Sequence, residues 1–415
     1  MQLDLLALVL LLMLAYVAGT LVNRLGYPSI IGELGVGIVF GPPILGLLQP
    51  NPTLAVLGTL GTLFLMLLVG MRIDARDLAK ASGTALLVAV GGFGATFAVG
   101  YFVTTLVFGR SSNEGLIVAV AIGNTALATL PRILLDLGLI EARVGQFLAA
   151  VSLVTVALLL TSFAAVDSIV RAGGVDLFRL GDVLLRAGAF LVGAALIGIF
   201  IFPRLRATLS RFNLVGRTNS FAVALFIGLF YAGLANLAGL AVILGAFIAG
   251  IFLREDMFPE GDFPAVLASL EDVAVRFLAP IFFVAAGFPF SFSVFQTSLF
   301  PVLLLIVLAL LGKFLAGALL SRFGPLTWRE SAVLGFGMNA KGGVDIVVAR
   351  SGLESKALSN EMYSIVVLLA TVGSLLTPVL LKLGRDWLVR RGELTAARSV
   401  PELATVPVVP AIVRN

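Results

Sequence analysis

The sequence of 415 residues contains no cysteine and no histidine, and only 12% of its residues are charged. Without cysteine the chain forms no disulfides and performs no thiol chemistry. Without histidine it lacks the commonest metal ligand and the usual proton carrier near neutral pH, so any proton transfer falls to Asp, Glu or Lys. Because soluble proteins average about 25% charged residues, the scarcity of charge disfavours a water-soluble domain.

Apolar residues dominate what is present. They make up 60% of the chain, and the mean hydropathy is +1.11. Apolar stretches of about 20 residues recur along the whole sequence, and each is long enough to cross the lipid bilayer as a helix. We therefore predict an all-α polytopic membrane protein. The net charge of +5 is attributed to arginines in cytoplasmic loops, which orient a membrane protein, and not to a nucleic-acid partner.

The apolar stretches predict about 13 transmembrane helices. The first stretch lacks a basic amino-terminal region and a cleavage site, so we interpret it as a retained helix and not as a signal peptide. Residues 386–415 are polar or rich in Pro and Val, and they predict a disordered tail. The predicted segments are 3–22, 29–48, 55–71, 83–109, 115–134, 144–170, 181–202, 218–237, 239–253, 265–287, 298–321, 329–350 and 361–383.

Loop charges predict the orientation of the chain in the membrane. Lys and Arg are concentrated in the loops that follow odd-numbered segments, as at Arg204, Arg206 and Arg211, and in the polar tail. Since cytoplasmic loops carry an excess of Lys and Arg, we expect the N-terminus outside and the C-terminus in the cytoplasm.

Two interrupted segments and a weak internal repeat favour a transporter. LGTLFLMLLVG at 60–70 resembles FLAPIFFVAAG at 277–287, which would match segments two to six with segments nine to thirteen as inverted five-helix repeats. Segment five contains Gly, Asn, Thr and Pro at 123–131, and segment twelve contains Asn, Lys and two Gly at 339–343. We predict two crossed, unwound helices with centres at about 123–130 and 339–343. The alternative is that Gly and Pro are simply common in membrane helices.

Three ionisable residues lie deep in predicted helices. Lys313 is flanked by apolar residues on both sides, and Lys341 and Asp345 share one helix face if segment twelve resumes its helix there. Charges inside a membrane are costly and are functional candidates by default. The alternative for Lys313 is a structural ion pair between helices. We expect Lys313 and Asp345 to form the electrostatic centre of the site, with Lys341 beside them.

The motifs PSIIGELGVGIVFGPPILG, FLMLLVGMRID, LGAFIAGIFL, LAPIFFVAAG, LLGKFLAG and GMNAKGGVDIVVA follow one another in the chain. In this order they resemble the monovalent cation:proton antiporters, the superfamily of bacterial sodium/proton and potassium/proton exchangers. The resemblance covers about residues 5–385. It implies a prokaryotic inner-membrane protein, a homodimer and elevator-type alternating access. It also implies one exchanger domain, 1–385, with core helices at about 55–170 and 265–383 and dimer or scaffold helices at about 3–48 and 181–253.

The sequence departs from this family at one position. Members carry an Asn-Asp or Asp-Asp pair on the helix after the first broken one. Here that pair falls on Thr155 and Val156, or with a shifted register on Leu153–Val154 or Ser152–Leu153, and segment six has no acid between Glu141 and Asp167. A Na⁺ or K⁺ ion would then rely on Asp345 and on neutral oxygens. The candidate residues for the transport site are Asp345, Lys313, Lys341, Thr155, Ser152, Asn124, Thr125, Thr129 and Asn339.

The predicted function is secondary active transport, with proton-coupled antiport of a monovalent cation as the leading hypothesis. Two alternatives are open: proton-coupled transport of an organic anion or other solute, and a relative that does not transport. No G-x-x-x-x-G-K-[ST] motif is present, so we expect neither ATP-driven pumping nor a nucleotide-binding domain in this chain. We expect no enzymatic activity and no cofactor, and a lipid bilayer and a second copy of the chain as partners.

Overall fold

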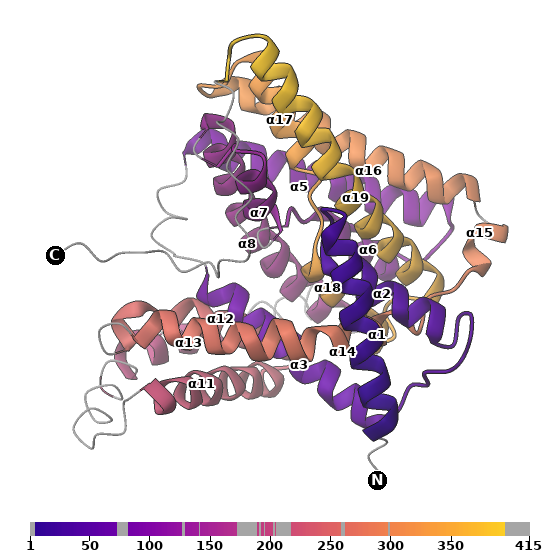
Figure 1. Cartoon of the computed structure of the whole chain (residues 1–415), viewed down its shortest axis with the longest axis vertical. Coiled ribbons are helices and arrows are strands. Elements are labelled where there is room, and N and C mark those ends of the chain that lie inside the picture. The colour runs from indigo at the N-terminus through magenta and orange to yellow at the C-terminus, as the bar shows by residue number, and fades with distance from the viewer. Residues whose placement is uncertain are drawn as a thin grey trace.

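The computed structural model describes residues 5–72, 82–126, 129–140, 142–171, 189–190, 192–194, 196–201, 204, 217–258, 262–297 and 299–394. Every regular element in these ranges is a helix (Figure 1). Seven of the described helices are long and apolar enough to cross a membrane. The prediction of an all-helical, multi-pass membrane protein is confirmed at this level.

The helices follow the predicted segments closely. Segment 265–287 is continuous in space, because the π-helix η4 (Asp272–Leu278) joins α13 to α14, and the π-helix η1 (Val103–Val107) extends α5. The α-helices are α1 (Leu5–Arg24), α2 (Ser29–Phe40), α3 (Pro52–Met71), α5 (Gly83–Phe102), α6 (Ser112–Gly123), α7 (Leu130–Asp136), α8 (Arg143–Arg171), α11 (Arg217–Leu237), α12 (Val242–Phe252), α13 (Asp262–Glu271), α14 (Ala279–Gly287), α15 (Ser293–Thr297), α16 (Leu299–Leu320), α17 (Trp328–Gly337), α18 (Gly343–Glu354) and α19 (Asn360–Arg390).

Two boundaries differ from the sequence prediction. Helix α2 ends at Phe40, where Gly41, Pro42 and Pro43 follow, so segment 29–48 is helical only in its first part. Helix α19 continues to Arg390, because Trp387, Leu388 and Val389 prolong its apolar pattern, so residues 386–390 are helical and do not belong to a disordered tail. Half of segment 181–202 and all of 395–415 lie outside the described residues.

Polar side chains fix where several helices begin. The side chains of Asn51, Ser82, Ser111, Thr327 and Ser359 each accept a hydrogen bond from a backbone N–H in the first turn of the helix that follows. Such caps satisfy N–H groups that have no partner inside the helix. They are needed here because unpaired backbone groups are costly near a bilayer.

The described helices pack as two bundles (Figure 1). The first bundle contains α1, α2, α3, α11, α12, α13 and α14, and the second contains α5, α6, α7, α8 and α15 to α19. The expected core helices 55–71 and 265–287 pack in the first bundle, with the expected scaffold helices. Small residues explain part of this packing: a Cβ on Gly70 of α3 would lie 2.2 Å from the carbonyl oxygen of Phe247 in α12, so only glycine permits this approach.

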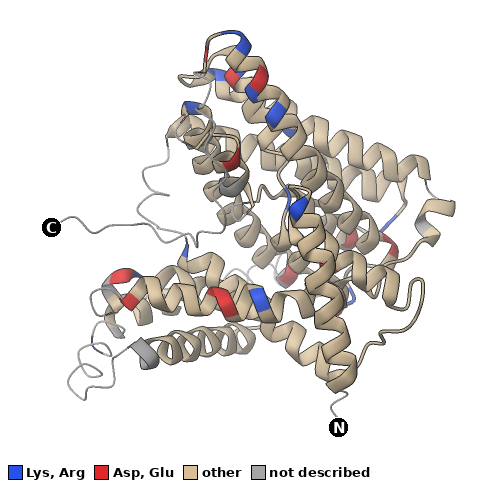
Figure 2. Cartoon of the chain, in the orientation of Figure 1, with Lys and Arg blue, Asp and Glu red and all other residues tan. Residues whose placement is uncertain are grey.

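The two bundles meet over a shared apolar surface, because buried side chains of both belong to one hydrophobic cluster. The hydroxyl of Tyr363 in α19 donates a buried hydrogen bond of 2.6 Å to the carbonyl of Ala286 in α14. Gly343, the first residue of α18, lies against the Phe283 ring of α14. Charged residues lie mostly towards the helix ends, whereas the helix surfaces are largely uncharged (Figure 2). This distribution suits helices that are surrounded by lipid.

Candidate functional site

Two helices of the second bundle are interrupted where the sequence predicts. Helix α6 ends at Gly123, residues 124–126 are not helical, and α7 begins at Leu130. Pro131 stands in the first turn of α7, where a missing N–H costs no hydrogen bond. Helix α17 ends at Gly337, and α18 begins at Gly343. Both predicted unwound centres are confirmed; residues 127–128 lie outside the described part.

The two unwound stretches are bonded to each other. The N–H of Ala126 donates to the carbonyl of Ala340 at 2.8 Å. The Thr125 hydroxyl donates to the carbonyl of Met338 at 2.9 Å, and the Thr129 hydroxyl donates more weakly to the carbonyl of Lys341 at 3.4 Å. Unwinding frees backbone groups, and the partner stretch satisfies several of them. We call this region, residues 122–126, 129 and 337–345, the crossing.

Both deep lysines reach the carboxyl end of α6. The Lys313 ammonium, which comes from α16, donates to the carbonyl of Gly123 at 2.7 Å and to that of Asn124. The Lys341 ammonium donates to the carbonyl of Ile122 at 2.5 Å and to that of Asn124 at 3.0 Å. Both side chains are buried. The carboxyl end of a helix carries a partial negative charge and leaves its last carbonyls free, so it attracts cations.

Asp345 lies at the amino end of a helix, which carries a partial positive charge, opposite to that of the carboxyl end of α6. It stands in the first turn of α18, and its Oδ2 accepts a hydrogen bond of 2.9 Å from the N–H of Gly342. Its Oδ1 lies 3.8 Å from the Lys341 ammonium, and both side chains are buried. The ammonium within ionic distance of Asp345 is thus that of Lys341, which precedes α18, while Lys313 donates to carbonyls. The expected centre of Lys313 and Asp345 stays a prediction.

Of the remaining predicted residues, Ser152 and Thr155 have hydrogen-bond partners within their own helix, whereas Asn124 and Asn339 have side-chain atoms without a partner. The hydroxyls of Ser152 and Thr155 in α8 each donate to a carbonyl four residues back, at 2.8 and 2.7 Å, so they satisfy their own helix. Asn124 is fully buried, and both polar atoms of its side chain have no hydrogen-bond partner. Asn339 donates weakly to the carbonyl of Gly335 at 3.4 Å, but its side-chain oxygen is unpartnered. Buried polar groups without partners are rare and require an explanation.

Comparison with known proteins identifies the family. The family model described as "Sodium/hydrogen exchanger, transmembrane" matches residues 9–382. The chain belongs to this family. Its members are transporters, and this sodium/hydrogen exchanger family member is accordingly a multi-pass membrane protein.

Relatives of this family member in other organisms are antiporters. The chain is 29% identical over 373 residues to the Na(+)/H(+)-K(+) antiporter GerN of Bacillus cereus, a match that covers 90% of this chain and 94% of GerN. It is 25% identical over 361 residues to a Na(+)/H(+) antiporter of Enterococcus hirae, with 87% and 92% of the two chains covered. The fold is similar to that of the sodium proton antiporter MjNhaP1 from Methanocaldococcus jannaschii at pH 8, with a TM-score of 0.70, 17% identity, and 92% and 97% of the two chains covered.

Sequence reasoning missed two small residues of α19 that hold Lys341 of this family member. The Ser374 hydroxyl donates to the carbonyl of Lys341 at 3.1 Å. A Cβ on Gly373 would lie 2.5 Å from Cγ of Lys341 and 3.0 Å from the carbonyl oxygen of Asn339. The only signal in the sequence is a Gly-Ser pair inside an apolar segment, a pattern typical of close helix packing.

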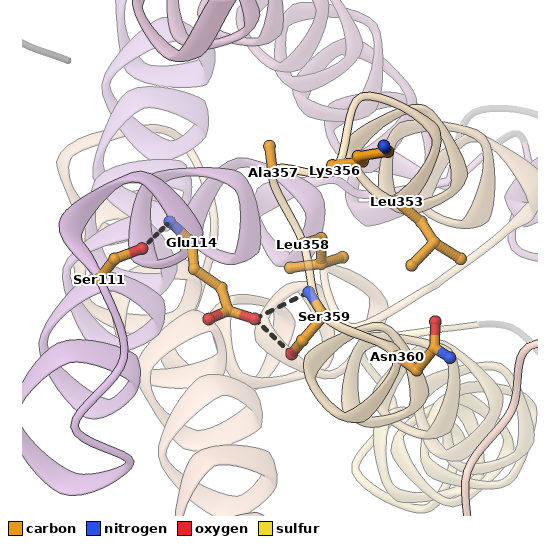
Figure 3. Close-up of a pocket in the computed structure, with 8 residues that line it drawn as sticks. All are labelled: Ser111, Glu114, Leu353, Lys356, Ala357, Leu358, Ser359 and Asn360. Atoms are coloured by element: carbon orange, nitrogen blue, oxygen red, sulfur yellow. Dashed lines mark hydrogen bonds between the residues drawn. The ribbon is translucent and has the colours of Figure 1, made fainter. Parts of the chain in front are cut away.

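A pocket of about 410 Å³ lies at the far ends of the broken helices, away from the crossing. There Glu114, in the first turn of α6, accepts hydrogen bonds from the backbone N–H of Ser359, at 2.9 Å, and from its hydroxyl (Figure 3). Glu114 thus ties the start of α6 to the start of α19. The residues that line the pocket are Ser111, Glu114, Leu353, Lys356, Ala357, Leu358, Ser359 and Asn360.

No group of three or more His, Cys, Asp or Glu among the described residues could hold a metal ion. Asp345 is the one carboxylate that the described residues bring to the crossing. Divalent cations such as Ca²⁺ take several carboxylates at once. The donor set of the crossing, carbonyls with a single carboxylate, suits a monovalent ion instead.

Proposed function

We propose that this protein is a secondary active transporter that exchanges protons for a monovalent cation, Na⁺ or K⁺, across the membrane. The observation that carries the proposal is the crossing, where two unwound helices bring together buried charges and carbonyls that no N–H of their own helix bonds. Transporters bind coupling ions at such breaks, where carbonyls and the carboxyl ends of half-helices act as ligands. The antiporter activity in the names of the relatives from Bacillus cereus and Enterococcus hirae supports the same activity here.

The charges at the crossing suggest how exchange is coupled. Lys313 and Lys341 both contact the carbonyl of Asn124, so two ammonium groups lie beside one carboxylate, Asp345. A cation that binds to Asp345 adds a further positive charge in a medium of low dielectric constant. The crossing accommodates it when one lysine releases a proton. Entry of the cation and loss of the proton are then linked, which is the basis of antiport.

A second candidate function follows from the same charge count. With both lysines protonated the crossing carries an excess positive charge, and a site of that sign attracts anions. An organic anion that enters with a proton is therefore the alternative substrate. It differs from the first candidate in the sign of the transported ion, which a flux measurement determines.

Flux into liposomes tests the proposal. We expect purified protein in liposomes to alkalinise the lumen when Na⁺ or K⁺ is added outside, because each entering cation is exchanged for a proton that leaves, and we expect no response to organic acids. Glu354→Gln, which alters an exposed acid at the far end of α18, serves as control. Flux of organic acids without cation exchange would establish the second candidate, and absence of both would leave a relative that does not transport.

We further propose that the second bundle moves as a unit against the first, by elevator-type alternating access. The division of the described helices into two bundles supports this, as does a correspondence between the broken helices. Ser111 caps α6 by accepting from the N–H of Glu114, and Thr327 caps α17 by accepting from the N–H of Glu330. Each helix then breaks after a glycine, Gly123 or Gly337. Equivalent caps and breaks are what an inverted repeat of five helices, within a total of about 13, would produce.

Distances between spin labels would test this movement, and the chain needs no background mutations because it contains no cysteine. Phe323 of the second bundle and Leu237 of the first are both exposed, at 76% and 84%, and are suitable sites for single cysteines. We expect the distance between them to take two values whose populations shift when cation is added. The matched pair Leu6 and Leu237, both in the first bundle, should keep one distance. A single distance for both pairs would contradict the elevator mechanism.

A homodimer formed through α1, α2, α11 and α12 completes the proposal. Helix α1 presents a row of exposed apolar side chains, including Leu6, Met13 and Tyr16. A fixed first bundle gives the moving bundle a stationary support, and a dimer makes that support larger. Native mass measurement in mild detergent should give twice the mass of the chain. A monomer that retains full transport would argue against this interface.

A further inference from the structure

We propose that the Tyr363 hydroxyl and the carbonyl of Ala286 form a latch that holds the two bundles in the arrangement of this structure, and that the chain bends at Pro289 and Phe290 when the latch opens. The inference rests on the proposed elevator movement. It goes beyond that movement by naming one contact that has to break and the two residues at which the chain bends.

The latch joins one helix of each bundle. Tyr363 stands in the first turn of α19, and its side chain is fully buried. Its hydroxyl donates at 2.6 Å to the carbonyl of Ala286, in the last turn of α14, where a carbonyl has no N–H of its own helix to bond. Because an O–H···O hydrogen bond spans at most about 3.0 Å, a displacement of α19 by about 1 Å is enough to break it.

The latch differs in kind from the apolar contacts around it. Gly343 of the second bundle lies against the Phe283 ring of the first, and buried side chains of both bundles share one hydrophobic cluster. Apolar attraction is not directional, so such surfaces can slide over one another and form new contacts. A buried hydroxyl and a buried carbonyl that separate each lose a partner, which is costly. The hydrogen bond therefore favours one position of the second bundle over the others.

Helix α14 and the residue after it are fixed to the first bundle. A Cβ on Gly287 would lie 2.7 Å from the carbonyl oxygen of Leu34 in α2, so the two backbones are in direct contact. The Phe288 side chain is buried in a cluster that includes Leu11 of α1 and Leu54 of α3. The carbonyl of Ala286 is therefore held by the first bundle and does not follow α19 when the second bundle moves.

The chain is fixed to the second bundle again from Ser291. The N–H of Ser291 donates at 2.8 Å to the buried Ser364 hydroxyl in α19. Pro289 and Phe290 lie between the two fixed parts, in a turn where the N–H of Phe290 donates to the carbonyl of Gly287 at 3.2 Å. Since the ring of proline fixes φ, the change in backbone conformation falls on ψ of Pro289 and on φ and ψ of Phe290. We call these two residues the hinge.

The latch is tested with Tyr363→Phe, which removes the hydroxyl and keeps the ring. The readout is the ratio of the populations of the two distances between spin labels at Phe323 and Leu237. Because one neutral hydrogen bond is lost from one arrangement only, we expect this ratio to shift about fivefold away from the arrangement of this structure.

The matched control is Tyr231→Phe. Tyr231 is also fully buried, and its hydroxyl donates at 2.8 Å to the carbonyl of Ala194. Ala194 precedes the π-helix η2 (Ile197–Ile201), which packs on α12 of the first bundle. This variant loses a comparable hydrogen bond that does not join the two bundles. We therefore expect a lower melting temperature and an unchanged ratio of the two populations.

The hinge is tested by cross-linking. The substitutions Ser291→Cys and Ser364→Cys give a pair of thiols, in a chain with no other cysteine, that a short bis-thiol reagent can join. Both positions belong to the second bundle in this account, so we expect the cross-linked protein to exchange cations as fast as the same variant before cross-linking. If the cross-link stops exchange, the chain does not bend at Pro289 and Phe290.

The possible outcomes separate the latch from the elevator movement. If Tyr363→Phe does not fold, Tyr363→Met provides a second variant without the hydroxyl. Two distances in wild type, with the same ratio in the Tyr363 variant, would overturn the latch alone. An equal shift in Tyr231→Phe would also overturn it, because the ratio would then follow stability in general. A single distance in every protein would overturn the elevator movement as well.

Discussion

Asp345 and the two lysines are each placed at a helix end whose partial charge they compensate. Asp345 is at the amino end of α18, and both ammonium groups are at the carboxyl end of α6. The sequence predicted the residues but not the carbonyls to which the two ammonium groups donate. A spacing of four predicted the contact of Lys341 with Asp345, whereas the carbonyl partners could not be predicted, because they depend on where α6 ends in space.

Asp345→Asn is expected to abolish cation exchange. Removing one partner of a buried ion pair costs about 3–5 kcal/mol, and the neutral oxygens that remain do not compensate for dehydration of a cation. A loss of that size corresponds to a reduction of flux by about a hundredfold or more. The measurement is the initial rate of proton movement in liposomes driven by a sodium or potassium gradient. Normal rates in this variant would show that Asp345 is not a ligand.

At the scale of helices, composition predicts breaks but not the way in which neighbours pack around them. Gly123, Pro131 and the Gly342–Gly343 pair indicated both interruptions correctly. The contact of Gly373 with the Lys341 side chain could not be predicted from the sequence, because a glycine in an apolar helix can pack against many different partners. The bundle that α3 and α14 join could not be predicted for a related reason: both helices are apolar on several faces, and only the close approach of backbones, as at Gly70, decides which neighbours they take.

Gly373→Ala is expected to weaken exchange by displacing Lys341. The new Cβ would lie 2.5 Å from Cγ of Lys341, which is too close, and overpacking of this kind costs about 1–3 kcal/mol. The matched control is Gly94→Ala in α5, where no atom lies within 4 Å of the added Cβ and better helix propensity should slightly stabilise the protein. Melting temperature and initial exchange rate should fall for Gly373→Ala only. Equal behaviour of the two variants would mean that the crossing tolerates the shift.

The substitution Glu393→Gln tests whether the contacts of Glu393 with Thr327 and Arg329 stabilise the start of α17. The hydrogen bond from the Thr327 hydroxyl, at 2.7 Å, and the neighbouring Arg329 guanidinium lower the pKa of Glu393. A carboxyl with a lowered pKa stabilises the fold fully above its unfolded pKa of about 4.3, and this contribution is lost as the pH falls through the folded pKa. The variant should therefore melt below wild type at neutral pH and approach it in acid. A difference in melting temperature that is unchanged by acidification would contradict this account.

At the scale of the whole molecule, the basic loops predict the orientation of the chain in the membrane, with the N-terminus outside and the C-terminus in the cytoplasm. A reporter enzyme fused after residue 394 should be active in the cytoplasm, and a tag placed before residue 5 should be accessible from outside. The physical reason is that loops rich in Lys and Arg are retained on the cytoplasmic side. Protease accessibility in intact cells and in inverted vesicles measures both ends. An external C-terminus would overturn the orientation.

The hydrogen bond from Ala126 to Ala340 joins the two unwound stretches within one bundle. All atoms proposed to bind the ion thus belong to a single body, and none is contributed by the other bundle. In the proposed elevator movement these atoms would therefore travel together and offer the same dissociation constant to both compartments. We expect inside-out and right-side-out vesicles to give equal half-saturating cation concentrations, so that the two gradients alone set the direction of exchange.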